Sequence, residues 1–308
     1  MSRIQSRLVG IAIGALALQS APVWAHHTGA GGAGAGGGLG AGDAGVFARD
    51  VEPPASWLEY SFEYADLDRD IGELITHQLQ GSYAFRVGTE RRNFALRASW
   101  PIFHLLSDVE RDAWGTGDLT AGLWWNALNG AVGDDEGSDR RLQYSVNLGL
   151  TTLFPIGDRD RDFGAKHFGN GATLAASLRY GPVGWIASSG LDWEYDGRER
   201  PGVSWSTGPA AFLWNDRISI LGTFSGLHLT DGDADTFRAG GRRIFFAPAM
   251  EIAPFTSGRL AGLSIGVAGR WAIQDTTRLR SDRVIPLTEP DLRSDVEASG
   301  IVTIRYAF

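Results

Sequence analysis

The sequence predicts an all-β protein, a transmembrane antiparallel β-barrel of about twelve strands connected as an up-and-down meander. Three observations predict this fold. Residues 1–25 have the layout of a cleaved secretory signal peptide, residues 55–308 alternate between apolar and polar side chains with a period of two, and the last alternating segment ends on Phe308. No continuous apolar run of about 20 residues follows residue 25, so only strands can carry this chain across a membrane.

The signal-peptide pattern is complete in the first 25 residues. Arg3 and Arg7 precede an apolar run over residues 8–18, and Ala25 completes a small-residue cleavage site. Cleavage there would start the mature chain at His26 and, by removing two arginines, change the formal net charge from −8 to −10. An acidic chain is a poor partner for nucleic acid, which requires a basic surface. Because the chain has no cysteine, an exported form must be stabilised by burial or by lipid.

A low-complexity tract, HHTGAGGAGAGGGLGAGDAG, occupies residues 26–45. It contains almost nothing to bury, so we expect a flexible N-terminal segment over residues 26–54. Its glycine pairs are not preceded by a strand pattern or followed by a helix pattern, so they do not indicate a dinucleotide site. The sequence therefore predicts three parts, with the barrel over residues 55–308, and no cofactor.

The alternating pattern is clearest in the first candidate strand. Leu58, Tyr60 and Tyr64 share one face, whereas Glu59 and Glu63 share the other. Segments of about ten residues with this alternation are typical of transmembrane strands. The predicted strands are 56–65, 77–87, 92–101, 117–126, 141–152, 171–180, 183–194, 202–214, 217–229, 243–252, 260–273 and 296–308. The ninth is ambiguous, because Ile218, Ile220 and Phe224 compete with Leu221, Leu227 and Leu229 for the apolar face.

The predicted connections alternate in length. From a periplasmic N-terminus, the odd-numbered connections are expected to be long and extracellular and the even-numbered ones short and periplasmic. The tight connections include residues 88–90, 181–182 and 215–216, and the connection over 127–140 is the exception. This sorting favours a barrel in the outer membrane of a Gram-negative bacterium, with outer-membrane lipid around it.

Aromatic residues distinguish a membrane barrel from a soluble one, because they gather where strands cross the two membrane interfaces. In a membrane barrel the apolar face meets lipid and the polar face lines the lumen. The predicted girdle residues are Trp57, Tyr60, Tyr64, Trp100, Trp125, Trp185, Trp193, Trp205 and Tyr306.

Polar residues on the other strand face are the candidate lumen lining. They either form a pore wall that filters solutes by charge or form salt-bridged packing that fills a narrow barrel. Both interpretations remain open from the sequence. The predicted set is Glu59, Glu63, Arg86, Asn93, Arg97, Asp118, Gln143, Asn147, Arg179 and Arg305.

The last segment, residues 296–308, is the most specific sequence evidence for an outer-membrane barrel. Val302, Ile304, Tyr306 and Phe308 share a face, and the chain ends on the last of these. A terminal aromatic residue on an alternating strand looks like the signal read by the barrel-assembly machinery of the outer membrane. We therefore expect that machinery to be a partner through Phe308.

Three stretches carry a resemblance to a known family. They are SYAFRVGTERRNFALRASWPIF (82–103), GTGDLTAGLWW (115–125) and LFPIGDRDRDFGAKHFGNG (153–171). Together they resemble the MetA-pathway of phenol degradation family of outer-membrane transporters, over residues 46–308. The resemblance implies a transporter-like barrel and brings no catalytic residues.

The sequence contains two kinds of candidate metal site, a histidine pair and two acidic segments. His26 and His27, together with the new α-amino group, would chelate Cu(II) or Zn(II), although a solvated tail explains the same residues. The other histidines have no metal-ligand spacing. The acidic segments 158–162 and 231–235 imitate the start of a calcium loop, but they lack its later glycine and glutamate and are better explained as exposed turns.

The function most consistent with the sequence is passive passage of a small solute, hydrophobic, aromatic or metal-related in kind, through the lumen. Two alternatives are a structural or adhesive barrel that displays acidic loops and an outer-membrane hydrolase. Ser145, Ser177 and Ser188 alternate inward without an accompanying inward histidine, so the sequence favours a protein that is not an enzyme. The sequence does not identify the solute.

Overall fold

The computed structural model describes residues 54–67, 72–88, 93–107, 112–133, 141–158, 168–194, 202–229, 238–239, 241–275, 278–279 and 296–308. The predicted signal peptide and residues 26–53 of the glycine-rich segment, with His26 and His27, lie outside the described residues. Among the described residues no helix is long and apolar enough to span a membrane.

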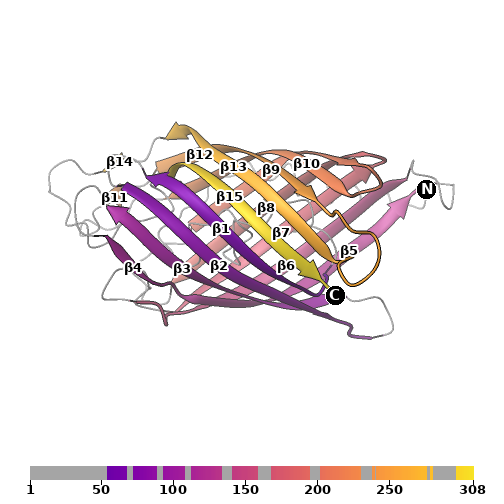
Figure 1. The fold of residues 1–308 in the computed structure, drawn as a ribbon, viewed down its shortest axis with the longest axis horizontal. Helices are drawn as coiled ribbons and strands as arrows, with labels where there is room; N and C mark the ends of the chain where they lie inside the picture. Colours follow the sequence, from indigo (N-terminus) through magenta and orange to yellow (C-terminus); the bar gives the residue numbers. More distant parts are fainter. Residues whose placement is uncertain are drawn as a thin grey trace.

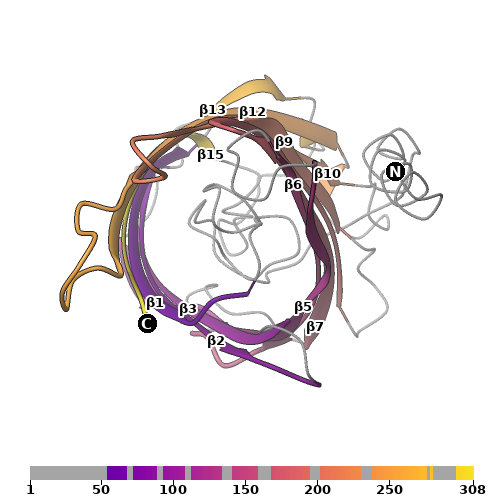
Figure 2. The ribbon, with the colours of Figure 1, turned by 90° about the vertical axis from the view of Figure 1, so that its right-hand side faces the viewer.

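Twelve antiparallel strands close into a barrel (Figure 1). Each strand pairs with its neighbours in the chain, and the β2–β3 and β1–β15 pairings complete the ring seen in Figure 2. The barrel strands are β1 (Trp57–Leu67), β2 (Gly72–Phe85), β3 (Phe94–Ser107), β5 (Leu119–Val132), β6 (Leu142–Phe154), β7 (Gly169–Tyr180), β8 (Val183–Glu194), β9 (Gly202–Leu213), β10 (Ile218–Leu229), β12 (Gly241–Ile252), β13 (Leu263–Asp275) and β15 (Val296–Ala307).

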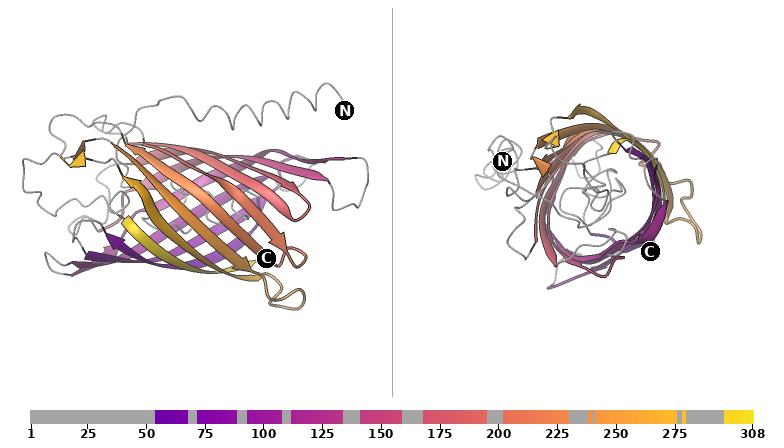
Figure 3. Two further views of the ribbon diagram at one scale, coloured as in Figure 1. Left: turned by 90° about the horizontal axis from the view of Figure 1, so that it is seen from above. Right: turned by 90° about the vertical axis from the view of Figure 1, so that its left-hand side faces the viewer.

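Three short strands lie outside the ring. β4 (Ala113–Thr116) pairs with the end of β3, and β11 (Arg238–Ala239) pairs with β14 (Arg278–Leu279). These strands mark the end of the barrel that lies on the left in Figure 1, which we call the loop end. The opposite end, which we call the turn end, holds the C-terminus and the tight connections 181–182 and 214–217 (Figure 3).

The prediction of a twelve-stranded antiparallel meander is confirmed, and each predicted segment overlaps one barrel strand. The main difference is β5, which extends to Val132 rather than ending near residue 126. A β-bulge between Asn126 and Leu128 shifts the register and lets the strand continue beside β6. Residues 127–132 of the exceptional connection are therefore strand.

Side chains alternate between an exposed outer wall and a buried inner wall. On β1, Leu58 is 62% exposed whereas Glu59 is 4% exposed. β10 has the facing that the sequence left open, because Leu221 is buried inside whereas Ile220 and Phe224 are exposed outside. An apolar exterior over a polar interior inverts the order of a soluble barrel and matches one surrounded by lipid.

The aromatic girdle is partly as predicted. Tyr60, Tyr64, Trp100, Trp125, Trp185 and Tyr306 are exposed on the outer wall, and the side chain of Trp193 lies outside the described residues. The assignment of Trp57 to the girdle is wrong. Trp57 is on the same face of β1 as Glu59 and is 5% exposed, because alternation from residue 59 places it inside the barrel.

The outward face of β6 provides a test of the lipid-facing assignment. Leu148 is exposed near the middle of this strand. Leu148→Arg should lower the free energy of unfolding in lipid by about 2–4 kcal/mol, because a cation at the bilayer midplane is poorly solvated. Leu148→Met, which keeps the apolar character, should change it by less than about 1.5 kcal/mol. Urea titration of both variants in vesicles measures the difference, and equal losses would contradict a lipid-facing Leu148.

Candidate pore lining

The residues predicted to line the lumen occupy three different places. Glu59, Glu63, Arg97, Asn147 and Arg305 are buried on the inner wall of β1, β3, β6 and β15. Asp118 is buried just before β5 at the loop end. The other four, Arg86, Asn93, Gln143 and Arg179, lie at the turn end.

The first and last strands meet through a buried ion pair. Glu59 of β1 and Arg305 of β15 are direct cross-strand partners. The Nε of Arg305 donates a hydrogen bond of 2.7 Å to Oε2 of Glu59, and both side chains are almost completely buried. The guanidinium carbon of Arg305 also lies 4.0 Å from the centroid of the Trp57 ring. The Arg305 guanidinium is thus stabilised by the Glu59 carboxylate and by the Trp57 ring.

Arg97 of β3 extends this arrangement around the wall. Its guanidinium carbon lies 4.2 Å from the Trp124 ring centroid and 5.8 Å from that of Trp57. On its other side Trp124 lies against Gly149, where an added Cβ would come within 3.0–3.1 Å of the indole. Glycine at this position lets the indole lie flat against β6. Arg97, Trp57 and Trp124 therefore form one stacked unit.

Nearer the loop end, on the same side of the barrel, Glu63 and Arg270 form a second pair of opposite charges. Nη2 of Arg270 on β13 lies 3.6 Å from Oε1 of Glu63, and the guanidinium carbon of Arg270 lies 4.9 Å from the Phe245 ring centroid. Sequence reasoning did not select Trp57, Trp124 or Arg270 as lumen residues. Alternation within their strands carries the signal for their facing, but their mutual contacts depend on strand register.

Small and apolar side chains form most of a second cluster on the inner wall. Several strands present buried alkyl groups beside the polar residues of the inner wall. On β8, β9 and β10 the buried inward positions are apolar or small polar residues, among them Ile186, Ser188, Ser206, Ala210 and Thr223. The cluster comprises Ala84, Ala95, Trp124, Ala175, Ile186, Ala210, Leu221 and Ala249, with Phe212 and Ala268 packed against it.

Asn147 belongs to a hydrogen-bonded group on β5 and β6. The Nδ2 of Asn126 donates to Oδ1 of Asn147 at 2.8 Å and to the hydroxyl of Ser145 at 2.9 Å. Asn126 is the residue at which the β5 bulge begins. The group therefore satisfies polar atoms where the ladder is interrupted.

Asp118 anchors a loop rather than lining a passage. Its Oδ1 accepts a 2.8 Å hydrogen bond from the backbone N–H of Gly157, and the N–H of Asp158 donates to the carbonyl of Thr116 at 2.7 Å. Gly117 allows the close approach, because a Cβ there would lie 2.4 Å from the ring of Phe103. Two of the stretches that resemble the transporter family, 115–125 and 153–171, thus meet at this point.

At the turn end two of the predicted residues, Arg179 and Asn93, stabilise connections. Arg179 donates to both carboxylate oxygens of Asp216, one of them at 2.8 Å, and its Nε donates to the carbonyl of Gly181. The pair steadies a turn in which Trp214, Asn215 and Asp216 all have positive φ. Arg86 and Gln143 are exposed, and Oδ1 of Asn93 accepts a hydrogen bond from the N–H of Val87.

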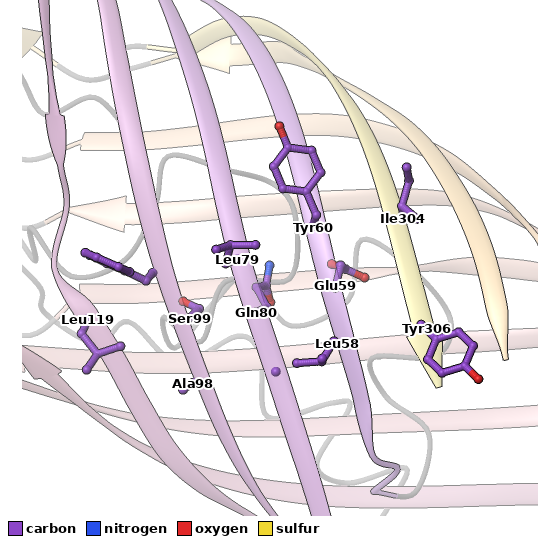
Figure 4. Close-up of a pocket in the computed structure, with 12 residues that line it drawn as sticks. Leu58, Glu59, Tyr60, Leu79, Gln80, Ala98, Ser99, Leu119, Ile304 and Tyr306 are labelled. Carbon is purple, nitrogen blue, oxygen red and sulfur yellow. The ribbon is translucent and has the colours of Figure 1, made fainter. Parts of the chain in front are cut away.

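Two hollows lie on the outer wall and not in the lumen. One, of about 460 Å³, is bordered by the outward side chains of Leu58, Tyr60, Leu79 and Trp100 (Figure 4). The other, of about 600 Å³, is bordered by Leu148, Leu150 and Leu191 among others. Both are apolar grooves on the surface that faces lipid. Within the described part of the chain, no group of three or more histidine, aspartate or glutamate side chains could hold a metal ion.

Solved structures of outer-membrane proteins are similar to this chain. An outer membrane channel from Pseudomonas putida F1 superposes with a TM-score of 0.60 at 9% identity, covering 83% of this chain and 96% of that chain. The KdgM porin has a TM-score of 0.47 at 8% identity, with 82% and 99% covered. No protein-family model matches the sequence, and no curated protein matches it. The similarity to the Pseudomonas channel shows that this chain has an outer-membrane β-barrel fold.

The loop anchor predicts a specific difference between two substitutions of Asp118. Asp118→Ala should lower the free energy of unfolding by about 1.5–3 kcal/mol, because the Gly157 N–H loses a charged acceptor. Asp118→Asn retains an acceptor oxygen and should lose clearly less. Urea unfolding of the three proteins in the same lipid measures this difference. Equal losses would mean that the hydrogen bond to Gly157 contributes nothing measurable.

Proposed function

We propose that this protein is an outer-membrane channel through which a small solute passes without energy input. The observation that carries the proposal is a closed barrel with an apolar exterior and with charged and polar side chains on its inner wall. A wall of this kind surrounds a path whose lining interacts with solutes by charge and hydrogen bonding. Membership of the MetA-pathway of phenol degradation family is part of the same proposal.

Two other functions compete with the channel. A purely structural or adhesive barrel is favoured by the buried Glu59–Arg305 and Glu63–Arg270 contacts, which stabilise the wall whether or not a solute passes. A serine hydrolase needs a serine beside a base such as histidine. Among the described residues Ser145 contacts Asn126, and the ring of His77 contacts the outward Tyr60 hydroxyl at 2.6 Å. These contacts do not support a nucleophile.

The proposed location includes two partners, outer-membrane lipid and the assembly machinery that would read the last strand. Tyr306 and Phe308 are both exposed on β15 or directly after it. Phe308→Ala should reduce the amount of heat-modifiable protein in the outer-membrane fraction of cells, whereas purified Phe308→Ala should refold in detergent like the parent protein. Unchanged yield in cells would remove the proposed signal, and recovery in the soluble periplasmic fraction would contradict the location.

Conductance tests the channel itself. The refolded protein in a planar bilayer should give stepwise KCl currents, since ions accompany water through a polar path.

We propose in addition that residues 26–45 narrow this path and that His26 and His27 bind a transition metal. Deletion of residues 26–45 should then raise the current, and Cu(II) or Zn(II) should change the current of the full chain only. A folded barrel that gives no current in either form would support the structural alternative.

A further inference from the structure

The 460 Å³ hollow of Figure 4 is a groove in the outer wall that crosses the seam where the barrel closes. Its two smallest lining residues, Gly81 of β2 and Ala98 of β3, are direct cross-strand partners. Gly81 also pairs with Leu58 of β1, and a Cβ at Gly81 would come within 3.2 Å of Cδ2 of Leu58. The wall is therefore hollow where small residues lie between the larger side chains of neighbouring strands.

The aromatic side chains that border the groove have their polar groups engaged within the protein. The hydrogen bonds join the Tyr60 hydroxyl to Nδ1 of His77 at 2.6 Å, Nε1 of Trp100 to the carbonyl of Gly117 at 3.1 Å, and the Tyr306 hydroxyl to the carbonyl of Arg259 at 2.8 Å. The lining aliphatic residues Leu58, Leu79 and Ile304 are exposed. An occupant of the groove consequently meets apolar surface, which favours a hydrocarbon over a polar solute.

The position of the groove identifies the source of that hydrocarbon. It lies on the apolar exterior of the barrel, on the face that meets lipid. Its volume of about 460 Å³ is within the range of clefts that hold small molecules, about 300–1,000 Å³. A single acyl chain of a membrane lipid is flexible and fully apolar, so it can follow a hollow of this kind between strands.

A cation lies at the turn end of the groove. Tyr306 borders the groove, and its hydrogen bond to the Arg259 carbonyl holds the 253–262 connection beside it. Arg259 is exposed, and the sequence of this connection contains no acidic residue. Tyrosine at the end of a membrane strand marks the level of the lipid headgroups. At that level a guanidinium offers paired donors that match a phosphate group.

We propose that this groove, defined by Leu58, Gly81, Ala98, Trp100 and Tyr306, binds one phospholipid of the periplasmic leaflet. One acyl chain lies in the groove, and the phosphate contacts the Arg259 guanidinium. Because the groove crosses the pairing of β1 with β15, the bound lipid contacts both strands of the closing seam. This inference rests on the proposed location of the barrel in the outer membrane.

Three probes separate recognition of the acyl chain from recognition of the headgroup. Dioleoylphosphatidylglycerol has both parts, dioleoylglycerol has the same chains without the phosphate, and glycerol 1-phosphate has the phosphate without the chains. Native mass spectrometry of the refolded full chain should detect one bound phosphatidylglycerol at a concentration about tenfold below that needed for dioleoylglycerol. Glycerol 1-phosphate should not bind at the concentration that saturates with phosphatidylglycerol, because an exposed ion pair alone is weak.

Substitutions assign the lipid to the groove. Ala98→Leu fills the hollow and Arg259→Gln removes the cation, and each should raise the half-saturating concentration of phosphatidylglycerol about tenfold. The matched controls are Ala211→Leu on the outer face of β9 and Arg217→Gln just before β10, which is three strands from β15 in the ring. Both controls should bind like the parent protein. Heat-modifiable migration checks folding, and Arg259→Gln, in an exposed connection, tests the site whatever Ala98→Leu does to folding.

The outcomes separate this inference from the channel and from the location. Phosphatidylglycerol that binds no better than dioleoylglycerol would overturn the lipid site, and so would binding that is unchanged in both Ala98→Leu and Arg259→Gln. A dimer of the parent protein that Ala98→Leu abolishes would also overturn it, because the groove would then be an interface between two copies. These three results leave the KCl current, and with it the channel, standing. Recovery in the soluble periplasmic fraction would overturn the location and the lipid site together.

Discussion

Closure of the ring is the constraint on which the rest of this structure depends. In hydrocarbon an unpaired strand edge is costly, so β1 and β15, at opposite ends of the barrel sequence, must pair along their whole length. The Glu59–Arg305 pair lies in that seam. A slip of one residue would turn Glu59 toward lipid and Leu58 into the lumen, so burial of this pair specifies the register that closes the barrel.

The same closure explains how the inner wall accommodates charge. A buried guanidinium is expensive unless it is paired or stacked, and closure brings the required partners from strands distant in sequence. Trp57 supports Arg305 and lies near Arg97, while Trp124 covers the other side of Arg97. Arrangements of this kind hold charges in fixed positions. A channel that filters by charge and a barrel that is merely stable both require this, which is why conductance has to separate them.

Much of the fold could be predicted because alternation with a period of two is a local property of each strand. Strand ends are harder to predict from the sequence, since the bulge at Asn126 that prolongs β5 depends on its pairing with β6. The girdle prediction for Trp57 is wrong because an aromatic residue near a strand end fits a girdle as well as a lumen. Sequence pattern assigns a face, and only register identifies the neighbour that Arg97 or Arg270 contacts.

The loop motifs at 115–119 and 155–158 also have a role that depends on contacts between segments distant in the sequence. From the sequence, GTGDL at 115–119 and PIGD at 155–158 resemble family motifs, and the pattern assigns no role to either. Their contact gives them one, because the Asp118 carboxylate accepts the Gly157 N–H and Gly117 clears the Phe103 ring. The sequence predicts Asp118 as a lumen residue because it is polar at the start of a strand. Its burial against a backbone donor makes it a structural anchor, whereas the buried charge of Arg97 lies further from the loop end, on the inner wall of β3.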